Sequence, residues 1–313
     1  MNSELNYEHV FEVLVDRTSK YLLEHNLKAM VLGISGGIDS TVVAAICHEV
    51  SKRTGIPLIG RSLPIKNKSD ELDTSTTVGF AFCNDFSVCS LRTSYAAFLN
   101  NIIKEEFEGD GTYYFNEVEF NLNHFQTPIA NGNIQARLRM IYLYNLASIN
   151  KGIVFSTDNQ TEYQLGFWTL HGDVGDFNPL FGLWKTEVYK LAKWIETMYG
   201  TMAEGADDAI TMEKYLRKEF AIHKSIALTP TDGLGISSSD LEQIGASSYA
   251  EVDDILQTML LYKNPENEKW DLLYDKYGEE VTDKVWNRHL ASEFKRKNLP
   301  ITIQRHEYST DDD

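Results

Sequence analysis

The segment Ser35-Gly36-Gly37-Ile38-Asp39-Ser40 brings together the chemical groups that hold a phosphate. Its two glycines let an anion approach the backbone closely, and its hydroxyl and carboxylate oxygens suit hydrogen bonds and hard metal ions. An apolar run at 29–34 precedes it and an Ala- and Val-rich stretch follows it, which predicts a buried strand, a turn and a helix. We expect Asp39, Ser40 and Thr41 to cap this helix, whose N-terminus favours anions. The pattern predicts an anion-binding turn.

Two common phosphate-binding motifs do not fit this turn. No Gly-Lys-Ser/Thr follows it, so it is not a P-loop, and its glycines lack the spacing of the dinucleotide fingerprint. An ordinary strand–turn–helix junction with a capping aspartate is the simpler alternative. The turn is, however, similar to the SGGxDS pyrophosphate loop of the ATP pyrophosphatase superfamily. Members of that superfamily cleave ATP between its α and β phosphates and adenylate a carbonyl or carboxyl oxygen.

This resemblance implies that the turn holds the leaving pyrophosphate and that Asp39 helps to hold Mg²⁺. The residues implied to contact ATP here are Gly33, Ile34, Ser35, Gly36, Gly37, Ile38, Asp39 and Ser40.

Alternating strands and helices must position this chemistry. The patterning predicts strands at 29–34, 56–62, 86–89 and 152–156, and helices at 4–25, 39–53, 69–83, 92–107, 131–149 and 185–198. Such alternation is typical of an α/β fold with an open parallel sheet and helices on both faces. Ligands of these sheets bind beyond the carboxyl ends of the strands. The turn at 35–40 and Ser156-Thr157-Asp158 both follow strands, so we expect them to face one site.

The length of the chain allows one large α/β domain or two smaller ones, and we expect a single domain over residues 1–313. Residues 108–127, rich in Asn, Gly and aromatic residues, are predicted to be an insertion. Residues 200–250 contain clusters of Gly, Pro and Ser, and we predict mobile loops over a site there, with a helix near 210–221.

Composition limits the partners and the compartment. The formal net charge of −17 argues against nucleic acid, whose phosphates require a basic surface. No apolar stretch is long enough to span a bilayer, and the acidic, amphipathic N-terminus does not resemble a secretory signal. The three cysteines are too few and too irregularly spaced for a disulfide framework or a zinc site. We therefore expect a cytoplasmic protein without a membrane partner.

Three further segments narrow the resemblance to one family. They are Asn131–Met140 (NGNIQARLRM), residues 156–192 (from STDNQTE to the LWKTEVYKLA stretch) and Lys295-Arg296 with LPITI at 299–303. With the turn at 35–40, in this order, they resemble the NAD synthetase family over residues 10–305. The resemblance implies an adenine-nucleotide α-hydrolase-like, three-layer fold. It also implies a ligase that uses ATP, Mg²⁺ and ammonia to amidate deamido-NAD through an acyl adenylate, releasing AMP and pyrophosphate, and that forms a homodimer with the dinucleotide site at its interface.

Family motifs carry the implied roles onto individual residues. Glu162 ends the match to T-D-x-x-x-E and would share Mg²⁺ with Asp39, while Thr157, Lys185 and Thr231 would contact ATP. The alternative for Glu162 is an exposed helix glutamate. Lys185 in the first turn of a helix lies at the unfavourable dipole end for a cation, which favours a function.

The residues implied to bind deamido-NAD are Arg137, Asp173, Asp176 and Lys295. For Arg137 and Arg139 a solvated helix face is the alternative. Many family members carry a lysine where this chain has Leu170 and a histidine where it has Phe294, so two potential positive charges are missing. Two further functions therefore stay open: an adenylating, amide-forming ligase for a different carboxylate, and an inactive nucleotide-binding regulator.

Free ammonia, not glutamine, is the expected nitrogen source. Family members that use glutamine on one chain carry an N-terminal amidase domain with a catalytic cysteine, much longer than the residues before Tyr7. Cys47 lies in an apolar helical stretch, where a thiol is inert, and Cys83 and Cys89 have no neighbouring histidine in sequence.

Overall fold

A parallel sheet of four strands forms the centre of the computed structural model, which describes residues 5–107, 114–115, 118–119, 128–229, 240–264 and 267–297. The strands are β1 (Met30–Gly33), β2 (Leu58–Ser62), β3 (Asp85–Val88) and β6 (Ile153–Val154), in the spatial order β3-β2-β1-β6. Residue Val31 of β1 lies opposite Ile59 of β2 and Val154 of β6. The predicted open parallel sheet is confirmed.

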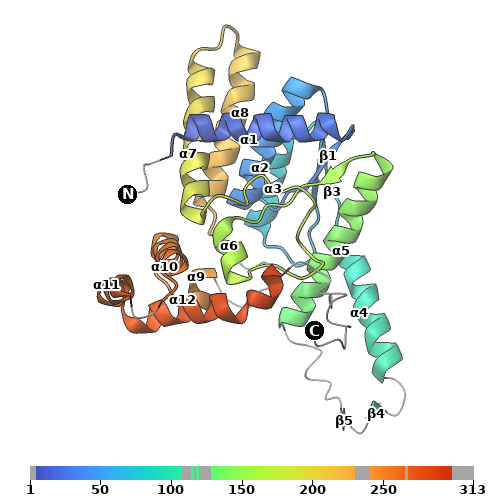
Figure 1. Cartoon of the computed structure of the whole chain (residues 1–313). Helices are drawn as coiled ribbons and strands as arrows, with labels where there is room; N and C mark the ends of the chain where they lie inside the picture. The colour runs from blue at the N-terminus through green and yellow to red at the C-terminus, as the bar shows by residue number, and fades with distance from the viewer. Residues whose placement is uncertain are drawn as a thin grey trace, which may run out of the picture.

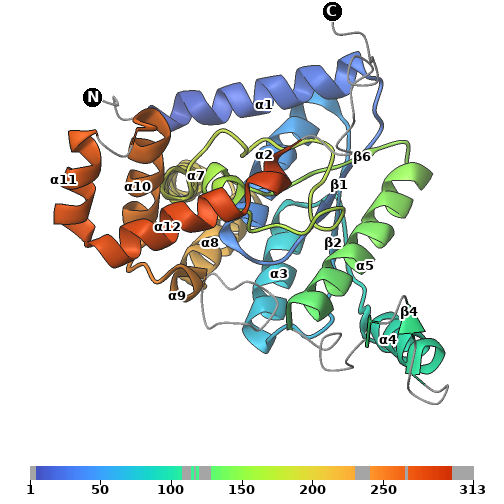
Figure 2. The ribbon, with the colours of Figure 1, turned by 60° about the horizontal axis from the view of Figure 1, so that its bottom comes forward.

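Helices cover both faces of the sheet (Figures 1 and 2). One face packs against α1 (Tyr7–Glu24), α2 (Ile38–Thr54), α3 (Ser69–Phe82), α7 (Lys185–Glu204) and α8 (Ala209–Ala227), and the other against α4 (Arg92–Phe107) and α5 (Pro128–Ile149). Side chains alternate along β1, so that Met30 and Leu32 join the first core and Val31 joins the second. The sheet is buried on both sides, as parallel sheets are.

A second group of helices, most of them from the C-terminal part of the chain, packs around its own core. It contains α6 (Gln160–Leu165), α9 (Asp240–Ile244), α10 (Tyr249–Leu261), α11 (Glu268–Tyr277) and α12 (Glu279–Ala291), with the short helix η2 (Glu293–Arg296) at the end. Its largest buried side chain is Trp270, whose indole N–H donates to the Tyr262 carbonyl at 2.6 Å. These helices lie beside α6 and the beginning of α7 (Figure 1), and the sequence analysis had not predicted any of α9 to α12.

Most predicted elements lie within a few residues of their observed positions. The predicted capping of α2 is wrong, because α2 begins at Ile38 with Gly37 as its N-cap residue and no side chain caps it. This earlier start puts Asp39 inside the first turn, where its carboxylate is free to reach other elements. Helix α8 extends the predicted 210–221 at both ends.

Two regions singled out in the sequence are described only in part. Within 108–127 the structure describes β4 (Tyr114–Phe115) and β5 (Val118–Glu119), which pair antiparallel beyond the end of α4 (Figure 1). Within 200–250 it describes the end of α7, α8, α9 and the start of α10, while 230–239 lies outside the described residues. The insertion and the mobile loops stay predictions.

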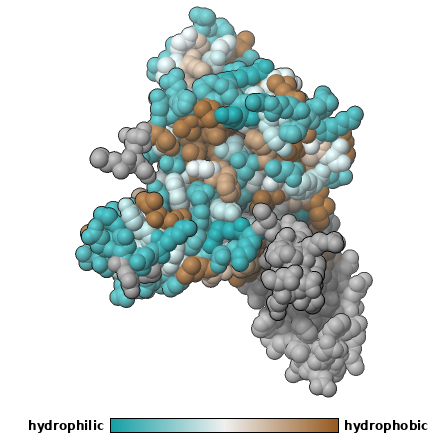
Figure 3. Space-filling view, in the orientation of Figure 1, coloured by the Kyte–Doolittle hydropathy of each residue, from teal (hydrophilic) through white to brown (hydrophobic). Residues whose placement is uncertain are grey.

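Apolar residues are scattered over the surface in small patches between hydrophilic ones on the face shown in Figure 3. In the part of the chain that the structure describes, no helix is both long enough and apolar enough to cross a membrane.

Candidate active site

The turn after β1 is built by contacts within its own few residues. Gly36 has φ +89, and a Cβ added there would lie 2.8 Å from the Ser75 backbone nitrogen and 2.9 Å from the Glu71 carbonyl oxygen of α3. The Ser35 hydroxyl accepts from the Gly37 N–H (3.1 Å) and contacts the Ser40 hydroxyl (2.9 Å). The glycine is thus required by both conformation and space, and the turn holds its shape against α3.

A cavity of about 240 Å³ opens at the carboxyl edge of β1 and β2, between this turn and α5. It is lined by 18 residues, among them Gly33, Ile34 and Ser35 of the turn, Thr157 after β6, and Asp173. The structure therefore brings together residues from the two strand ends that the sequence predicted to share a site. A concave site at the carboxyl ends of parallel strands is the expected place for a ligand of this fold.

Two arginines that were not predicted as site residues also line this cavity. Arg61, at the end of β2, pairs with Asp85 through two bonds of 3.0 and 3.1 Å. Arg139 donates to the Leu63 carbonyl oxygen at 3.1 Å, and burial lowers the pKa of its guanidinium. Because positions two apart on a helix face different ways, Arg139 lines the cavity while Arg137 is exposed. The motif A-R-x-R-M carried a signal for both arginines.

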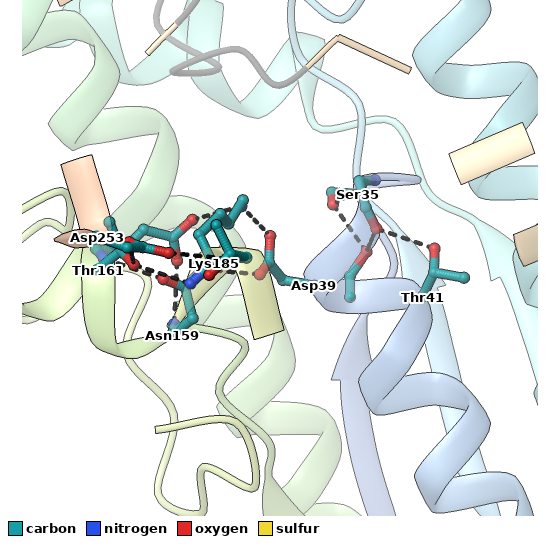
Figure 4. A network of polar contacts seen from close by, with 11 residues as sticks. Ser35, Asp39, Thr41, Asn159, Thr161, Lys185 and Asp253 are labelled. Atoms are coloured by element: carbon teal, nitrogen blue, oxygen red, sulfur yellow. Dashed lines mark hydrogen bonds and ion pairs between the residues drawn. The ribbon is translucent and has the colours of Figure 1, made fainter. Parts of the chain in front are cut away.

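Lys185, which does not line the cavity, joins two acidic side chains from different helices (Figure 4). Its ammonium lies 2.5 Å from Asp39 Oδ2 and 2.9 Å from Glu162 Oε1, and its side chain is only 2% exposed. Burial alone would lower the pKa of Lys185, but the two carboxylates outweigh it and raise that pKa well above its ordinary value. Burial and the neighbouring Asp39 charge raise the pKa of Glu162 to about 8. The three groups form one charge cluster.

Asn159 ties two helix N-termini into this charge cluster. It is the N-cap of α6, where its side-chain oxygen accepts from the Glu162 N–H (3.1 Å) and its own N–H donates to Glu162 Oε2 (3.2 Å). Its amide nitrogen donates to Asp39 Oδ1 at 2.8 Å. The carboxylates of Asp39 and Glu162 are therefore oriented by hydrogen bonds from the same residue.

These two carboxylates form a donor set that fits Mg²⁺. Mg²⁺ is bound in proteins through one or two carboxylates, with substrate phosphates and water completing its shell. Their repulsion is offset in this structure by the Lys185 ammonium, so the space between them already accommodates a positive charge. Among the described residues, no three of His, Cys, Asp and Glu gather in a way that could hold a metal by themselves.

Of the predicted acceptor-binding residues, only Asp173 lines the cavity. Burial raises the pKa of Asp173, and its carboxylate accepts from the Thr169 N–H at 2.6 Å. Arg137 donates to the Leu170 carbonyl oxygen (3.1 Å), Asp176 accepts from the Tyr144 hydroxyl (2.7 Å), and Lys295 donates to the Gly166 and Trp168 carbonyls (2.7 and 2.5 Å).

The sequence analysis also singled out Thr231 and Phe294. Thr231 lies outside the described residues. Phe294, which stands where the family usually has a histidine, is 52% exposed on the short helix η2.

Asp158 is an acidic side chain that the sequence analysis did not assign. Burial and the nearby Asp173 charge raise its pKa to about 7, and it accepts from the Ser156 hydroxyl at 2.5 Å. Its position directly after Thr157, at the end of β6, was the available signal. It is a further acidic group at the carboxyl end of β6, next to Thr157 of the cavity lining.

Comparison with known proteins identifies the family to which this site geometry belongs. The family model described as NAD synthase matches residues 10–299. A protein of Finegoldia magna named NH(3)-dependent NAD(+) synthetase is 30% identical over 297 residues, which are 94% of this chain and the whole of the relative.

Solved structures share the fold at lower identity. The NH3-dependent NAD synthetase of Campylobacter jejuni, in complex with the nitrate ion, is 21% identical with a TM-score of 0.62, and the match covers 96% of this chain and 100% of that one. The NMN synthetase of Francisella tularensis is 24% identical with a TM-score of 0.69, and the match covers 96% of this chain and 99% of that one. At these identities the similarity establishes the α/β fold.

Proposed function

The chain belongs to the NAD synthase family, and we propose that it converts deamido-NAD to NAD with ATP and ammonia. The reaction forms a C–N bond, so the protein is a ligase of NAD biosynthesis. One observation carries the proposal: Asp39 and Glu162 are 146 and 23 positions from Lys185 in the sequence, yet their carboxylate oxygens lie 2.5 and 2.9 Å from its ammonium nitrogen. An inactive nucleotide-binding protein would have no need of this complete set.

The first step activates the acceptor. A carboxylate oxygen of the nicotinate ring attacks the α-phosphorus of ATP, the bond from that phosphorus to the bridging oxygen breaks, and pyrophosphate leaves. The turn at 35–40 would hold the leaving pyrophosphate through backbone N–H groups and the hydroxyls of Ser35 and Ser40. Lys185 would neutralise phosphate charge, and Thr157 and Thr231 would contact ATP.

Asp39 and Glu162 would hold Mg²⁺ at this site. When bound, the ion neutralises charge on the phosphate oxygens and orients them for displacement. For this to happen the Lys185 ammonium must leave the space between the two carboxylates, since two cations cannot share it. Lys185 would then be available to the phosphates.

The second step forms the amide. Ammonia attacks the acyl carbon of the adenylate, the carbon–oxygen bond to the phosphate breaks, AMP leaves, and the nitrogen gives up a proton. Catalysis of this kind depends on positioning and charge neutralisation more than on a covalent nucleophile. Arg137, Asp173, Asp176 and Lys295 would position deamido-NAD.

Ammonia is the proposed nitrogen source because the chain's cysteines do not favour glutamine hydrolysis. Burial raises the pKa of Cys47 well above its ordinary value and that of Cys83 to about 12, so both stay thiols. For Cys89 the effect of burial is outweighed by hydrogen bonds to Ser87 and Tyr142, which lower its pKa, but both partners are hydroxyl groups and neither is a histidine base. The relative from Finegoldia magna is named for ammonia. Three free cysteines also fit our proposal of a reducing, cytoplasmic location.

We further propose a homodimer with the dinucleotide site at its interface. Ile141 and Ile149 of α5 are 67% and 70% exposed, and Tyr144 is 40% exposed. Arg137, Ile141 and Tyr144 are four and three positions apart, so they share one face of α5. The face that carries a proposed substrate residue is therefore also the apolar one. Light scattering at micromolar concentration should give a dimer, and an Ile141→Glu variant should give a monomer; a monomeric wild type contradicts the proposal.

A second acceptor is favoured by one observation. Leu170 and Phe294 remove two positive charges expected for a dinucleotide, and the solved structure with the TM-score of 0.69 is an NMN synthetase. Nicotinate mononucleotide has the same carboxylate but lacks the adenosine monophosphate half of deamido-NAD, so the same two steps would convert it to NMN. The relative kcat/KM of the two acceptors decides between them.

The deciding experiment mixes the purified chain with ATP, Mg²⁺, ammonium chloride and either acceptor, and follows AMP, pyrophosphate and the amide product by chromatography. We expect NAD from deamido-NAD, with pyrophosphate formed in equal amount, and little product when glutamine replaces ammonium. Efficient synthesis with ammonia-free glutamine contradicts the nitrogen source. Failure with both acceptors contradicts the function.

A further inference from the structure

The first N–H groups of α7, the helix that begins with Lys185, are bound by residues far away in the sequence. Its N-cap residue is Trp184, whose indole cannot accept a hydrogen bond. The Lys185 N–H donates to Thr161 Oγ1 (2.9 Å), and the Thr186 N–H donates to Asp253 Oδ2 (2.9 Å). The first two N–H groups of α7 are thus bound by α6 and α10, while the N–H of the N-cap residue Trp184 donates to Glu187 Oε2 of α7 itself (2.9 Å).

Asp253 and Thr161 are themselves joined deep inside the protein. The Thr161 hydroxyl donates to Asp253 Oδ1 at 2.5 Å, and the two residues are 1% and 2% exposed. Both carboxylate oxygens of Asp253 are therefore occupied, and its negative charge lies at the positive end of the α7 dipole. A buried carboxylate with these partners holds its geometry tightly, because any shift leaves a charge unpaired.

Thr161 and Asp253 are each linked to a proposed catalytic side chain, through a sequence neighbour, a backbone hydrogen bond or a residue of the same helix. Thr161 directly precedes Glu162 on α6, and it binds the backbone of Lys185. Tyr249, one helical turn before Asp253 on α10, places its ring centroid 5.5 Å from Lys185 Nζ. Figure 4 shows Thr161 and Asp253 on the side of Lys185 away from the turn that carries Ser35.

We propose that Thr161 and Asp253 form a clamp that positions Lys185 for the phosphates of ATP. Neither side chain touches substrate in this proposal; both are positioning residues that fix where α7 begins and so where the Lys185 ammonium can reach. The inference rests on the proposed phosphate-binding role of Lys185. It assigns a function to the contact between α10, in the C-terminal helical core, and the catalytic edge of the sheet.

The first test compares Thr161→Val, which removes only the hydroxyl, with Thr161→Ser, which keeps it. The matched control is Thr282→Val on α12, a fully buried threonine whose hydroxyl donates to the Gly278 carbonyl (2.7 Å). We expect Thr161→Val to lower kcat about 10- to 100-fold, since misplacement of about 1 Å can cost that much. Thr161→Ser and Thr282→Val should keep kcat within about twofold of wild type, while Thr282→Val lowers thermal stability.

A second test asks whether the effect passes through Lys185. Denaturant midpoints of metal-free protein are measured for Thr161→Val, Lys185→Met and the double variant, beside the same cycle with Thr282→Val. If the clamp positions the Lys185 side chain between Asp39 and Glu162, the midpoint shift of the Thr161→Val/Lys185→Met double variant should be smaller than the sum of the two single shifts. The shift of the Thr282→Val/Lys185→Met double variant should equal the sum of its two single shifts. Asp253→Asn should reproduce the loss of kcat seen in Thr161→Val.

The outcomes separate this proposal from the function on which it rests. If Lys185→Met leaves turnover unchanged, the assigned role of Lys185 is wrong. If Lys185→Met lowers turnover but Thr161→Val behaves like Thr282→Val, or if the Thr161 cycle is additive, the clamp is wrong while the function stands.

Discussion

Two helix N-termini meet at the candidate active site, and they are held in opposite ways. The start of α2 is shaped by residues 35–41, whose serine and threonine hydroxyls bond to one another and to the Gly37 carbonyl. The start of α7 is bound by Thr161 and Asp253, which are 24 and 67 positions from their partners. The start of α2 is therefore built mainly by its own residues, although Gly36 packs on α3 and the Thr41 hydroxyl contacts Ser225 of α8 at 2.7 Å. The start of α7 depends on α6 and α10 for its first two N–H groups.

The charged residues at these two helix starts also differ in how the helix dipole acts on them. Asp39 in the first turn of α2 is favoured by the helix dipole, whereas Lys185 at the first position of α7 is opposed by it. Lys185 is kept there by the two carboxylates that it separates, and an apolar residue at this position would leave both without their counter-charge. In the proposed function, the start of α2 would bind phosphate and the start of α7 would place the Lys185 cation for catalysis.

The largest effect is expected when the acidic groups between the two ends are removed. Asp39→Ala and Glu162→Ala should each lower Mg²⁺-dependent pyrophosphate release at least about 1000-fold, because charge on the departing pyrophosphate is no longer neutralised. Circular dichroism should show a folded protein. Glu8→Ala, which removes an exposed acid at the same position of α1, is the control. Unchanged turnover in either variant would end the metal assignment.

The second-largest loss of turnover is expected when the Lys185 ammonium at the start of α7 is removed. Lys185→Met should lower turnover about 100-fold or more and destabilise the metal-free protein, because Asp39 and Glu162 are left facing each other. It should also bind Mn²⁺, a probe for Mg²⁺, more tightly than wild type, since the competing ammonium is gone. Electron paramagnetic resonance measures free Mn²⁺ directly; weaker or equal binding contradicts the exchange of cations.

A smaller effect, on stability, is expected when the turn before α2 is distorted. Gly36→Ala forces a side chain onto a φ of +89 and against backbone atoms of α3, so it should cost about 1–3 kcal/mol of stability. Gly182→Ala, where an added Cβ meets no atom within 4 Å, is the matched control. Urea unfolding compares the two variants. Equal stability of both would show that the turn is not held by this close approach.

The smallest effect is expected at Asp158, whose ionisation should change the stability of the protein. Asp158 ionises in the folded protein at a pKa of about 7, above its ordinary value, so the unfolded chain loses its proton first. Its contribution to stability is therefore present below about pH 4 and is lost as the pH rises to about 7. Asp158→Asn, which can still accept from Ser156, should melt higher than wild type at pH 8 and not at pH 4. A difference independent of pH contradicts the shifted pKa.

The sequence predicted the features that depend on neighbours in the chain. The turn at 35–40, the strand-to-helix alternation and the meeting of two strand ends at one edge follow from local pattern and the geometry of parallel sheets. The start of α2 was misplaced because Asp39 has good capping chemistry, yet Gly37 and the close packing on α3 fix the turn two residues earlier.

What the sequence could not predict depends on distant contacts. Nothing in the residues around Asp253 indicates that it caps a helix that begins at position 185, because the contact exists only once α10 packs on α6 and α7. Arg139 could not be separated from Arg137 without knowing which face of α5 covers the cavity. The four helices α9 to α12 have clear apolar faces but no motif.

The central claim, that the acceptor carboxylate is adenylated, is tested most directly with ¹⁸O in the nicotinate carboxylate of deamido-NAD. During turnover with ATP, Mg²⁺ and ammonium, AMP should acquire one labelled oxygen, because the bond that breaks in the second step joins the acyl carbon to that oxygen. Mass spectrometry of the AMP should show this label at one atom per NAD formed. Unlabelled AMP, or label in inorganic phosphate together with ADP, would contradict the account.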